Sequence, residues 1–281
     1  MIDPADSKQL ESLLRRHGID LKHRLGQNFL VDPSVRDAVA GSAAIAPEDH
    51  VLEVGAGVGT LTVALAPLCR KVTAVEIDGR LIPALRDATA GLANVEIVRS
   101  DILRFNVRSA FPQGGEVVAG NIPYHVTGAL VRKLLDDEPR PRRLSLVVQK
   151  EVAERWTAST GASLSTVAVQ VYARARLVFT IPATAFNPPP RVDSALVSLE
   201  VRPKPAVDVD DLDRFFRFVE SIFQFRRKQL GGALGRLAGA GGAGAAARLG
   251  AMGIDPTRRA QTLSLTEWEA LYRGFSPGAG G

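Results

Sequence analysis

Short apolar runs alternate with helix-compatible segments through the middle of the chain. Five runs are rich in valine and isoleucine and are mainly apolar along their length, without strict alternation: His50–Val54, Val72–Val75, Val95–Val98, Val117–Ala119 and Leu144–Val148. Continuous apolar runs are typical of strands buried on both faces of a parallel sheet. Because helical segments separate the runs, the pattern predicts a doubly wound α/β fold with a mainly parallel, Rossmann-like sheet.

The segments before and after these runs follow other patterns. The first fifty residues have a helical pattern that ends in a loop at residues 46–49. Two later stretches, Thr166–Val178 and Ala195–Val201, are β-rich, with no evident long helix between them. We therefore expect a helical N-terminal extension and, at the edge of the sheet, an antiparallel pair of strands.

The periodicity breaks at Val201–Pro205, where two prolines indicate a linker. This linker predicts an α/β domain over residues 1–202, including the N-terminal extension. A small helical domain is expected over residues 207–281.

Within the C-terminal part, Leu212–Leu237 has apolar residues at helical spacing. Gly239–Ala247 is almost entirely glycine and alanine, and we expect a loop or a poorly ordered helix end there. The pattern becomes helical again over Leu263–Phe275, with Thr266 as the candidate N-cap before Glu267.

Positive charge is concentrated in the C-terminal part. The net charge is +5 with a pI near 9.6, but the segment from Arg214 to Arg248 holds seven basic residues against one acid, Glu220. Arg226, Arg227 and Lys228 are consecutive. Such a cluster suits a polyanion such as RNA, although a solvated helix face has the same composition.

The composition excludes several classes of protein. No apolar run approaches the roughly 20 residues needed to cross a bilayer. The acidic N-terminus, Asp3 and Asp6, lacks the features of a signal peptide. Cys69 is the only cysteine, so an internal disulfide is excluded and no metal site is expected. These features predict a cytoplasmic protein without a membrane partner.

A glycine-rich turn follows the first apolar run, in the sequence Glu53–Thr60. Glycines at a strand-to-helix turn let the backbone approach a ligand closely. The spacing is Gly-x-Gly-x-Gly after an acid, whereas a dinucleotide site prefers Gly-x-Gly-x-x-Gly. S-adenosylmethionine carries an amino-acid head and a sulfonium cation, so this loop beside Glu53 suits it better than NAD.

Acidic residues end the next two apolar runs. Glu76 lies about twenty residues after the glycine turn, where an acid can accept both ribose hydroxyls. Asp101 can accept a hydrogen bond from the adenine amine, with the backbone of Ile102 at the ring edge. Each acid could instead cap a helix. Their occurrence after consecutive strands favours a nucleoside pocket.

The tetrapeptide Asn121-Ile122-Pro123-Tyr124 ends the fourth run, and active sites of open α/β sheets lie at the carboxyl ends of strands. The Asn121 side-chain carbonyl and the Ile122 backbone carbonyl can accept the two hydrogens of an adenine amine. The nitrogen lone pair would then point at a methyl group. Tyr124 offers a ring for stacking the base. Because a sulfonium is an excellent leaving group, positioning can carry most of the catalysis without a strong base.

These motifs together resemble the rRNA adenine N6,N6-dimethyltransferases. The resemblance spans roughly residues 20–275 in the family's order, and its motifs are 25–30, the glycine turn, Glu76–Asp78, Asp101, Asn121–Tyr124, Gln149–Arg155, Phe186–Ser194 and Phe225–Lys228. It implies an enzyme that uses S-adenosylmethionine to methylate adenine in RNA. His125 replaces the usual asparagine, and we assign it no role.

The resemblance also implies roles for single residues. Asn28, the backbone of Leu30, and Gly55 would hold the methionine end of the cofactor. The ribose would be bound by Glu76, the cofactor's adenine by Asp101, and Asn121 would face both cofactor and target. Phe186 would form the second aromatic wall, with the flipped base between it and Tyr124.

The bacterial housekeeping members modify two adjacent adenines near the 3′ end of small-subunit rRNA. The resemblance therefore implies dimethylation of both, and with it a contribution to ribosome biogenesis by a monomeric enzyme. A paired N6 is inaccessible, so the target must be extruded or unpaired.

Three other interpretations remain. A resistance methyltransferase of the same superfamily would modify an adenine in large-subunit rRNA, and a non-catalytic assembly factor would keep the fold without the reaction. An NAD-linked oxidoreductase would share the sheet and the ribose-binding acid. The motif Phe186–Ser194 and the run Phe225–Lys228 favour the housekeeping enzyme over the resistance enzyme. Intact Asn121, Tyr124 and Glu76 argue against a non-catalytic factor, and the glycine spacing with the tetrapeptide argues against the oxidoreductase.

Overall fold

The structure is a computed structural model that describes residues 2–19, 28–111, 116–123, 126–136, 138–237 and 241–275. Contacts divide the chain into two compact units. The first comprises Met1–Glu154 and Arg174–Val201, and the second Arg155–Ala173 and Arg202–Gly281. This division differs from the expected one because residues 155–173 group with the C-terminal helices and not with the α/β part.

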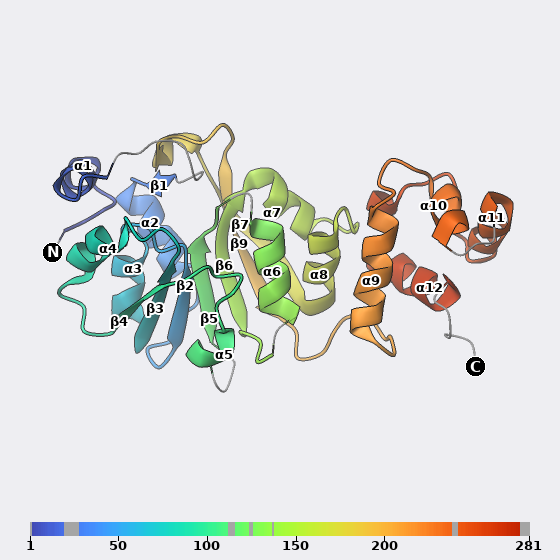
Figure 1. Cartoon of the computed structure of the whole chain (residues 1–281), viewed down its shortest axis with the longest axis horizontal. Coiled ribbons are helices and arrows are strands. Elements are labelled where there is room, and N and C mark those ends of the chain that lie inside the picture. The colour runs from blue at the N-terminus through green and yellow to red at the C-terminus, as the bar shows by residue number, and fades with distance from the viewer. Residues whose placement is uncertain are drawn as a thin grey trace. The chain divides into compact units, whose positions relative to one another are not determined.

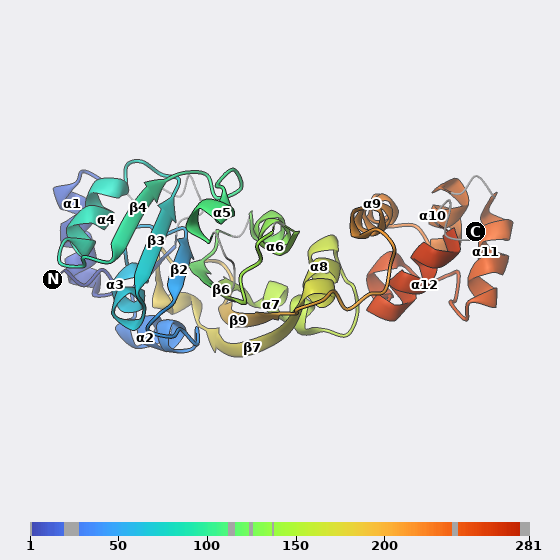
Figure 2. The ribbon, with the colours of Figure 1, turned by 90° about the horizontal axis from the view of Figure 1, so that it is seen from below.

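The first unit is built on a seven-stranded sheet with the order β4-β3-β2-β5-β6-β9-β7 (Figures 1 and 2). Its strands are β2 (His50–Val54), β3 (Lys71–Glu76), β4 (Val95–Arg99), β5 (Val117–Asn121), β6 (Arg143–Gln149), β7 (Ala173–Ile181) and β9 (Ser194–Val201). The first five are parallel, and β9 is antiparallel to β6. The predicted mainly parallel, doubly wound sheet is therefore confirmed.

The strand order fixes where a ligand can bind. From β2 the chain proceeds outward through β3 and β4, and then crosses back to add β5 on the other side of β2. Ligands of open α/β sheets bind at such a switch point, in the crevice at the carboxyl ends of the strands. Both the glycine turn after β2 and Asn121 at the end of β5 flank this point.

Helices connect the strands and cover both faces of the sheet (Figure 2). They are α1 (Ser7–Arg16), α2 (Pro33–Gly41), α3 (Thr62–Leu65), α4 (Ile82–Thr89), α5 (Val107–Ala110), α6 (Thr127–Asp136) and α7 (Lys150–Thr157), with 3₁₀ turns at Ala66–Leu68 and Ala183–Ala185. The N-terminal segment is not wholly helical as predicted. It contains a short strand, β1 (Phe29–Leu30), that pairs with β8 (Phe186–Asn187) in a separate two-stranded sheet.

The prediction of a strand over Thr166–Val178 is wrong in its first half. Residues Leu164–Tyr172 form the helix α8, and only the segment from Ala173 onward is the strand β7. Ser163 caps the helix, since its hydroxyl accepts a hydrogen bond from the Thr166 backbone N–H at 3.2 Å. Burial on most sides of α8 explains the valine-rich composition that indicated a strand.

The second unit has, besides α8, four helices among the described residues: α9 (Leu212–Phe223), α10 (Leu230–Leu237), α11 (Gly241–Ala251) and α12 (Leu265–Phe275), with a 3₁₀ turn at Ala260–Thr262. A turn at residues 224–229 therefore divides the expected helical segment Leu212–Leu237 into two. The core is aromatic: Phe215 lies 5.5 Å from Phe216 and 5.6 Å from Tyr272, between ring centroids.

Two further predictions for this unit are wrong. The glycine- and alanine-rich stretch is helical from Gly241 onward, and a Cβ at Gly235 would lie 2.7 Å from the Gly241 carbonyl oxygen, so glycine permits close packing. The cap of α12 is not Thr266 but Ser264, whose hydroxyl accepts from the Glu267 N–H at 3.2 Å while the Glu267 carboxylate accepts from the Ser264 N–H at 2.8 Å.

No helix in the described parts of the chain is both long enough and apolar enough to cross a membrane.

Candidate active site

The floor of the site is the glycine turn between β2 and α3. Gly55 and Gly57 have φ of +71° and +60°, a conformation in which side chains are strained. The N–H groups of Gly55 and Ala56 both donate to the Val75 carbonyl, which fixes the turn against β3. A Cβ at Gly55 would lie 3.4 Å from the carbonyl oxygen of Asn121 and would fill the space between the two strand ends.

Glu76 lies at the end of β3 with its carboxylate held by the backbone. Oε2 accepts from the Gly57 N–H and Oε1 from the Asp78 N–H, each at 2.8 Å. Burial raises the pKa of Glu76, while these two backbone donors lower it. The carboxylate is thus fixed at the wall of the pocket, in the place expected for the group that binds the ribose.

Asp101 and its neighbours form the next part of the wall. The Asp101 carboxylate accepts from the Leu103 N–H at 2.9 Å within a turn. The next helix, α5, is capped by Asn106, so Asp101 is not a helix cap. Asp101 and Ile102 both line the pocket, and so does Ile77, which is 60% exposed. An apolar side chain as exposed as Ile77 is suited to contact a flat ring such as adenine.

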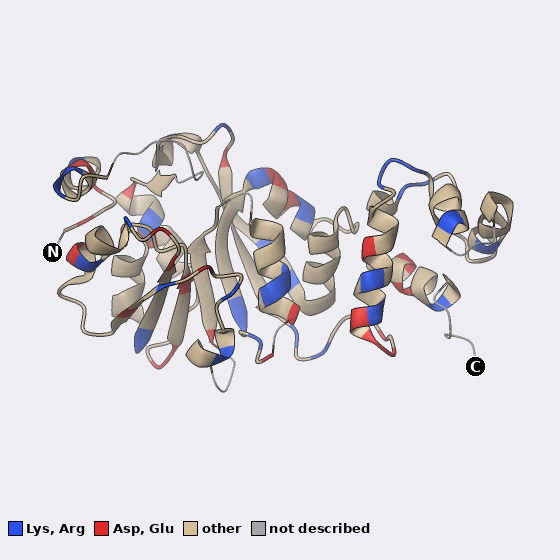
Figure 3. Ribbon diagram, in the orientation of Figure 1, with Lys and Arg blue, Asp and Glu red and all other residues tan. Residues whose placement is uncertain are grey.

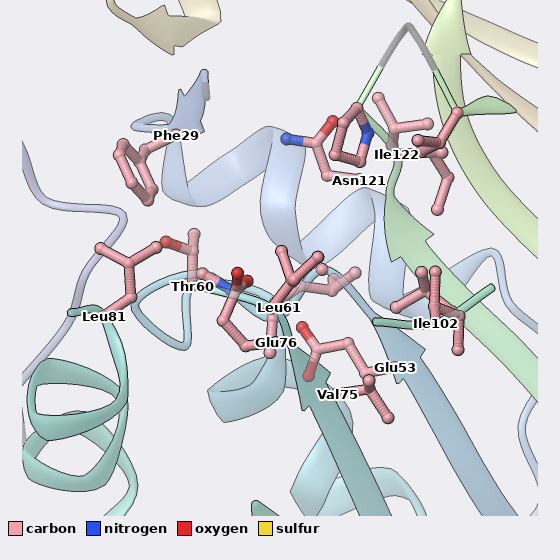
Figure 4. Close-up of a pocket in the computed structure, with 18 of the residues that line it drawn as sticks. Phe29, Glu53, Thr60, Leu61, Val75, Glu76, Leu81, Ile102, Asn121 and Ile122 are labelled. Atoms are coloured by element: carbon pink, nitrogen blue, oxygen red, sulfur yellow. The ribbon is translucent and has the colours of Figure 1, made fainter. Parts of the chain in front are cut away.

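Glu53 lies beneath the pocket and is 1% exposed. Its Oε2 accepts from the Thr62 hydroxyl at 2.6 Å. Burial raises the pKa of Glu53 to about 8, although the bond from Thr62 lowers it, and the nearby Glu76 raises it further. Figure 4 shows Glu53 and Glu76 on one side of the pocket and Asn121 on the other. At neutral pH, Glu53 is therefore mainly protonated.

Asn121 ends β5 and is oriented by the N-terminal segment. Its Nδ2 donates to the Asn28 carbonyl at 2.9 Å, and because only the NH₂ group can donate, this bond identifies the other atom as the carbonyl oxygen. The Ile122 N–H donates to the Val147 carbonyl at 3.0 Å, which holds the turn against β6. The side-chain carbonyl of Asn121 is therefore the group left to accept a substrate hydrogen.

The N-terminal wall consists of Asn28, Phe29 and Leu30. Leu30 pairs with Phe186 across the two-stranded sheet, and Phe29 pairs with Asn187. The ring of Phe29 also lies above the glycine turn, where a Cβ at Gly57 would lie 3.2 Å from its Cε1. The predicted cofactor residues Asn28, Leu30, Gly55, Glu76, Asp101 and Asn121 thus all line one pocket.

Of the two expected aromatic walls, only Phe186 belongs to the described residues. Phe186 is only 3% exposed and packs in the hydrophobic core, outside the residues that line the pocket. Tyr124 and His125 lie outside the described residues, as do residues 25–27 of the N-terminal motif. The stacking role of Tyr124 and Phe186 stays a prediction.

The lining also includes residues that the sequence analysis missed. Thr60, Leu61 and Leu81 contribute to the wall, and the Thr60 hydroxyl is buried without a hydrogen-bond partner. Among the described residues that line the pocket, the acidic side chains are the carboxylates of Glu76 and Asp101 and the mainly neutral Glu53, and there is no lysine, arginine or histidine. Such a site disfavours a pyrophosphate and suits a cationic ligand.

The candidate RNA-binding residues lie in the second unit. Arg226, Arg227 and Lys228 are exposed in the turn between α9 and α10, which appears as a blue loop in Figure 3. Within the described part of the chain none of the three pairs with a carboxylate. Their arrangement leaves them accessible, and their contact with RNA remains a prediction.

The strand order, the glycine turn at the switch point and the acidic nucleoside pocket define an S-adenosylmethionine-dependent methyltransferase. The family model for ribosomal RNA adenine dimethylases matches residues 18–271. The chain therefore belongs to the ribosomal RNA adenine dimethylase family, whose members transfer methyl groups from S-adenosylmethionine to adenine in ribosomal RNA.

Relatives of known name agree with this assignment. The chain is 41% identical to the ribosomal RNA small subunit methyltransferase A of Pelotomaculum thermopropionicum, over the full length of both chains. With the protein of that name from Shouchella clausii it shares 38% identity over 96% of each.

Two solved structures are similar over most of the chain. A dimethyladenosine transferase from Plasmodium falciparum has a TM-score of 0.69 at 26% identity, covering 87% of this chain and 96% of its own. The 23S rRNA methyltransferase ErmE has a TM-score of 0.67 at 29% identity, covering 89% of this chain and 100% of its own.

Proposed function

We propose that this enzyme dimethylates the N6 amines of two adjacent adenines near the 3′ end of small-subunit rRNA and so contributes to ribosome biogenesis. The observation that carries this proposal is full-length similarity to small subunit methyltransferases at 36–41% identity. The acidic pocket at the switch point supplies the chemistry that the reaction needs.

In this proposal the cofactor lies along the pocket from Asn121 to Asp101. The methionine end is held by Asn28, the Leu30 backbone and Gly55, all of which line the pocket. Glu76 accepts the ribose hydroxyls, and Asp101 accepts the adenine amine. When bound, S-adenosylmethionine supplies a methyl group on a cationic sulfur, which the surrounding carboxylates favour over a neutral or anionic ligand.

The protein contributes mainly by positioning the target amine. The Asn121 side-chain carbonyl and the Ile122 backbone carbonyl accept its two hydrogens, so that the nitrogen lone pair points toward the methyl group. The Asn121–Asn28 hydrogen bond of 2.9 Å supports this role because it fixes the amide orientation. When held by these residues, S-adenosylmethionine would supply the methyl group with a neutral thioether as the leaving group, and the amine held by Asn121 and Ile122 would release its proton to solvent.

Tyr124 and Phe186 would hold the extruded base between two rings. Because Phe186 is 3% exposed, we expect binding of the target to uncover its ring. We further propose that Arg226, Arg227 and Lys228 contact the RNA backbone, and that the enzyme acts as a monomer in the cytoplasm, on rRNA within the small subunit or its precursor.

The test is methyl transfer from labelled S-adenosylmethionine to small-subunit particles that lack adenine dimethylation, followed by nucleoside mass analysis. Labelled dimethyladenosine from these particles, and no label in already modified particles, supports the proposal. Label on large-subunit rRNA would instead assign the enzyme to the resistance branch. Cofactor binding without transfer to either RNA would indicate an assembly role.

A further inference from the structure

The first unit has a set of exposed cations of its own, Lys150 and Arg191. Lys150 begins α7 directly after β6, and Arg191 lies in the loop between β8 and β9. Figure 3 shows blue segments in both places. A backbone hydrogen bond joins the two segments, since the Lys150 N–H donates to the Asp193 carbonyl at 3.0 Å.

The loop that carries Arg191 is anchored at its base. The Asp193 carboxylate accepts from the Ala183 N–H at 3.0 Å, so Asp193 holds two parts of the backbone together. Ser194, the next residue, pairs with Gln149 in the β6–β9 ladder. Because the ends are fixed, Arg191 and Val192 are presented outward from a defined position.

The side chains of Lys150 and Arg191 are exposed, and within the described structure neither forms an ion pair. Neither Lys150 nor Arg191 pairs there with a carboxylate, whereas Arg142 pairs with Asp49 at 2.7 Å. Val192 is 43% exposed, which is unusual for a large apolar side chain between two charged residues. Exposed cations around an apolar side chain are a combination suited to a nucleic-acid strand, which offers phosphates and base faces.

The position of these residues relates them to the target base. Val147, two residues before the end of β6, pairs with Asn121 on β5, so Lys150 directly follows the strand next to the one that ends in Asn121. Arg191 lies five residues after Phe186 of β8, in the loop that follows this strand. Both cations therefore lie beside the segments that would hold the extruded adenine.

We propose that Lys150 and Arg191 bind the RNA phosphates flanking the extruded adenine, and that Val192 contacts the neighbouring base. This inference rests on the proposed function. An extruded nucleotide needs its backbone held on both sides, and a cation after β6 together with one in the loop between β8 and β9 would provide this. The cluster Arg226–Lys228 would anchor the RNA elsewhere and would not replace them.

The test is the double variant Lys150→Gln, Arg191→Gln. We expect the KM for unmodified small-subunit particles to rise at least tenfold, with cofactor affinity unchanged. The slope of log binding constant against log salt concentration should fall in magnitude by about 1.4, since each contact to a single-strand phosphate contributes roughly 0.7. The variant Val192→Thr should weaken binding severalfold without changing the slope.

The matched control is Arg174→Gln, Arg176→Gln, which removes two exposed charges near the start of β7, at the far end of that strand from Ile181. This control should leave the KM within twofold of wild type. Equal effects of the two double variants would mean that net charge alone matters and would overturn the proposal. An unchanged KM and salt slope in the first variant would overturn it too. Failure of the wild-type enzyme to methylate these particles would instead refute the proposed function.

Discussion

The protonated state of Glu53 makes a quantitative prediction about stability. Burial raises its pKa to about 8 from an ordinary value of 4.5. In the unfolded chain Glu53 ionises near pH 4.5, while in the folded protein it stays neutral until about pH 8. The folded state therefore loses stability as pH rises through this window, by about 1.4 kcal/mol for each pH unit.

The variant Glu53→Gln removes this loss. Glutamine has the same shape, and its side-chain carbonyl can still accept the hydrogen bond from Thr62. We expect the two proteins to have similar stability at pH 4.5, and the variant to be more stable by about 3 kcal/mol at pH 7. Urea unfolding without cofactor, followed by circular dichroism at several pH values between 4.5 and 8.5, measures the difference.

The control is Glu96→Gln on the exposed part of β4. A hydrogen bond from Lys71 lowers the pKa of Glu96, so its stabilising contribution is present above pH 4.5 and is lost as pH falls. This variant should gain no stability at high pH. A stability difference for Glu53→Gln that stays constant from pH 4.5 to 8.5 would show that Glu53 ionises normally, and the reasoning from burial would be refuted.

Three further predictions concern the site. Asn121→Ala should abolish methyl transfer, at least 100-fold in kcat, while RNA binding stays nearly intact in a filter-binding assay; equal loss of both would make Asn121 a structural residue. Gly55→Ala should weaken S-adenosylmethionine binding more than tenfold by calorimetry, whereas Gly18→Ala, with φ +63° and open space around it, has the same backbone strain and should not. Neutralising Arg226, Arg227 and Lys228 should weaken RNA binding and reduce its salt slope by about 2, and an unchanged slope would place these cations away from the RNA.

The sheet was predictable because its signal is local. A strand buried on both faces is mostly apolar, as His50–Val54 is apart from His50 and Glu53, and this run agrees with β2 residue for residue. The same rule failed at Leu164–Tyr172, because a helix buried on most sides is also continuously apolar. Ser163 was the one sign of a helix start, but a serine is weak evidence for an N-cap because many serines cap no helix.

The helix α11 could not be predicted for a different reason. Its glycine-rich sequence has low intrinsic helix propensity, and the helix forms where it packs on α10. The backbone of Gly241 approaches Gly235 closely only in the folded arrangement, and the sequence near residue 241 does not predict this contact. Tertiary packing thus overrode the local preference.

For the site, the sequence could predict which residues lie at the strand ends but not how all the side chains around them are oriented. Strand ends and motif spacing were enough to predict Glu76, Asp101 and Asn121. The contributions of Thr60 and Leu81 depend on how side chains point after packing, which spacing does not determine. The burial of Phe186 is a similar case, because a motif specifies the residue but not whether its ring is covered.

The connection between distant motifs has a consequence for the order of events. Asn28 accepts the hydrogen bond that orients Asn121, and the adjacent residues Phe29 and Leu30 pair with the segment of Phe186. A cofactor that orders Asn28–Leu30 would thereby fix both the amide facing the target amine and the strand that carries the aromatic wall. Cofactor binding should therefore raise affinity for the unmodified RNA, and by thermodynamic reciprocity the RNA should raise affinity for the cofactor by the same factor. If the two affinities proved independent, the two-stranded sheet would serve only to hold the N-terminal segment in place.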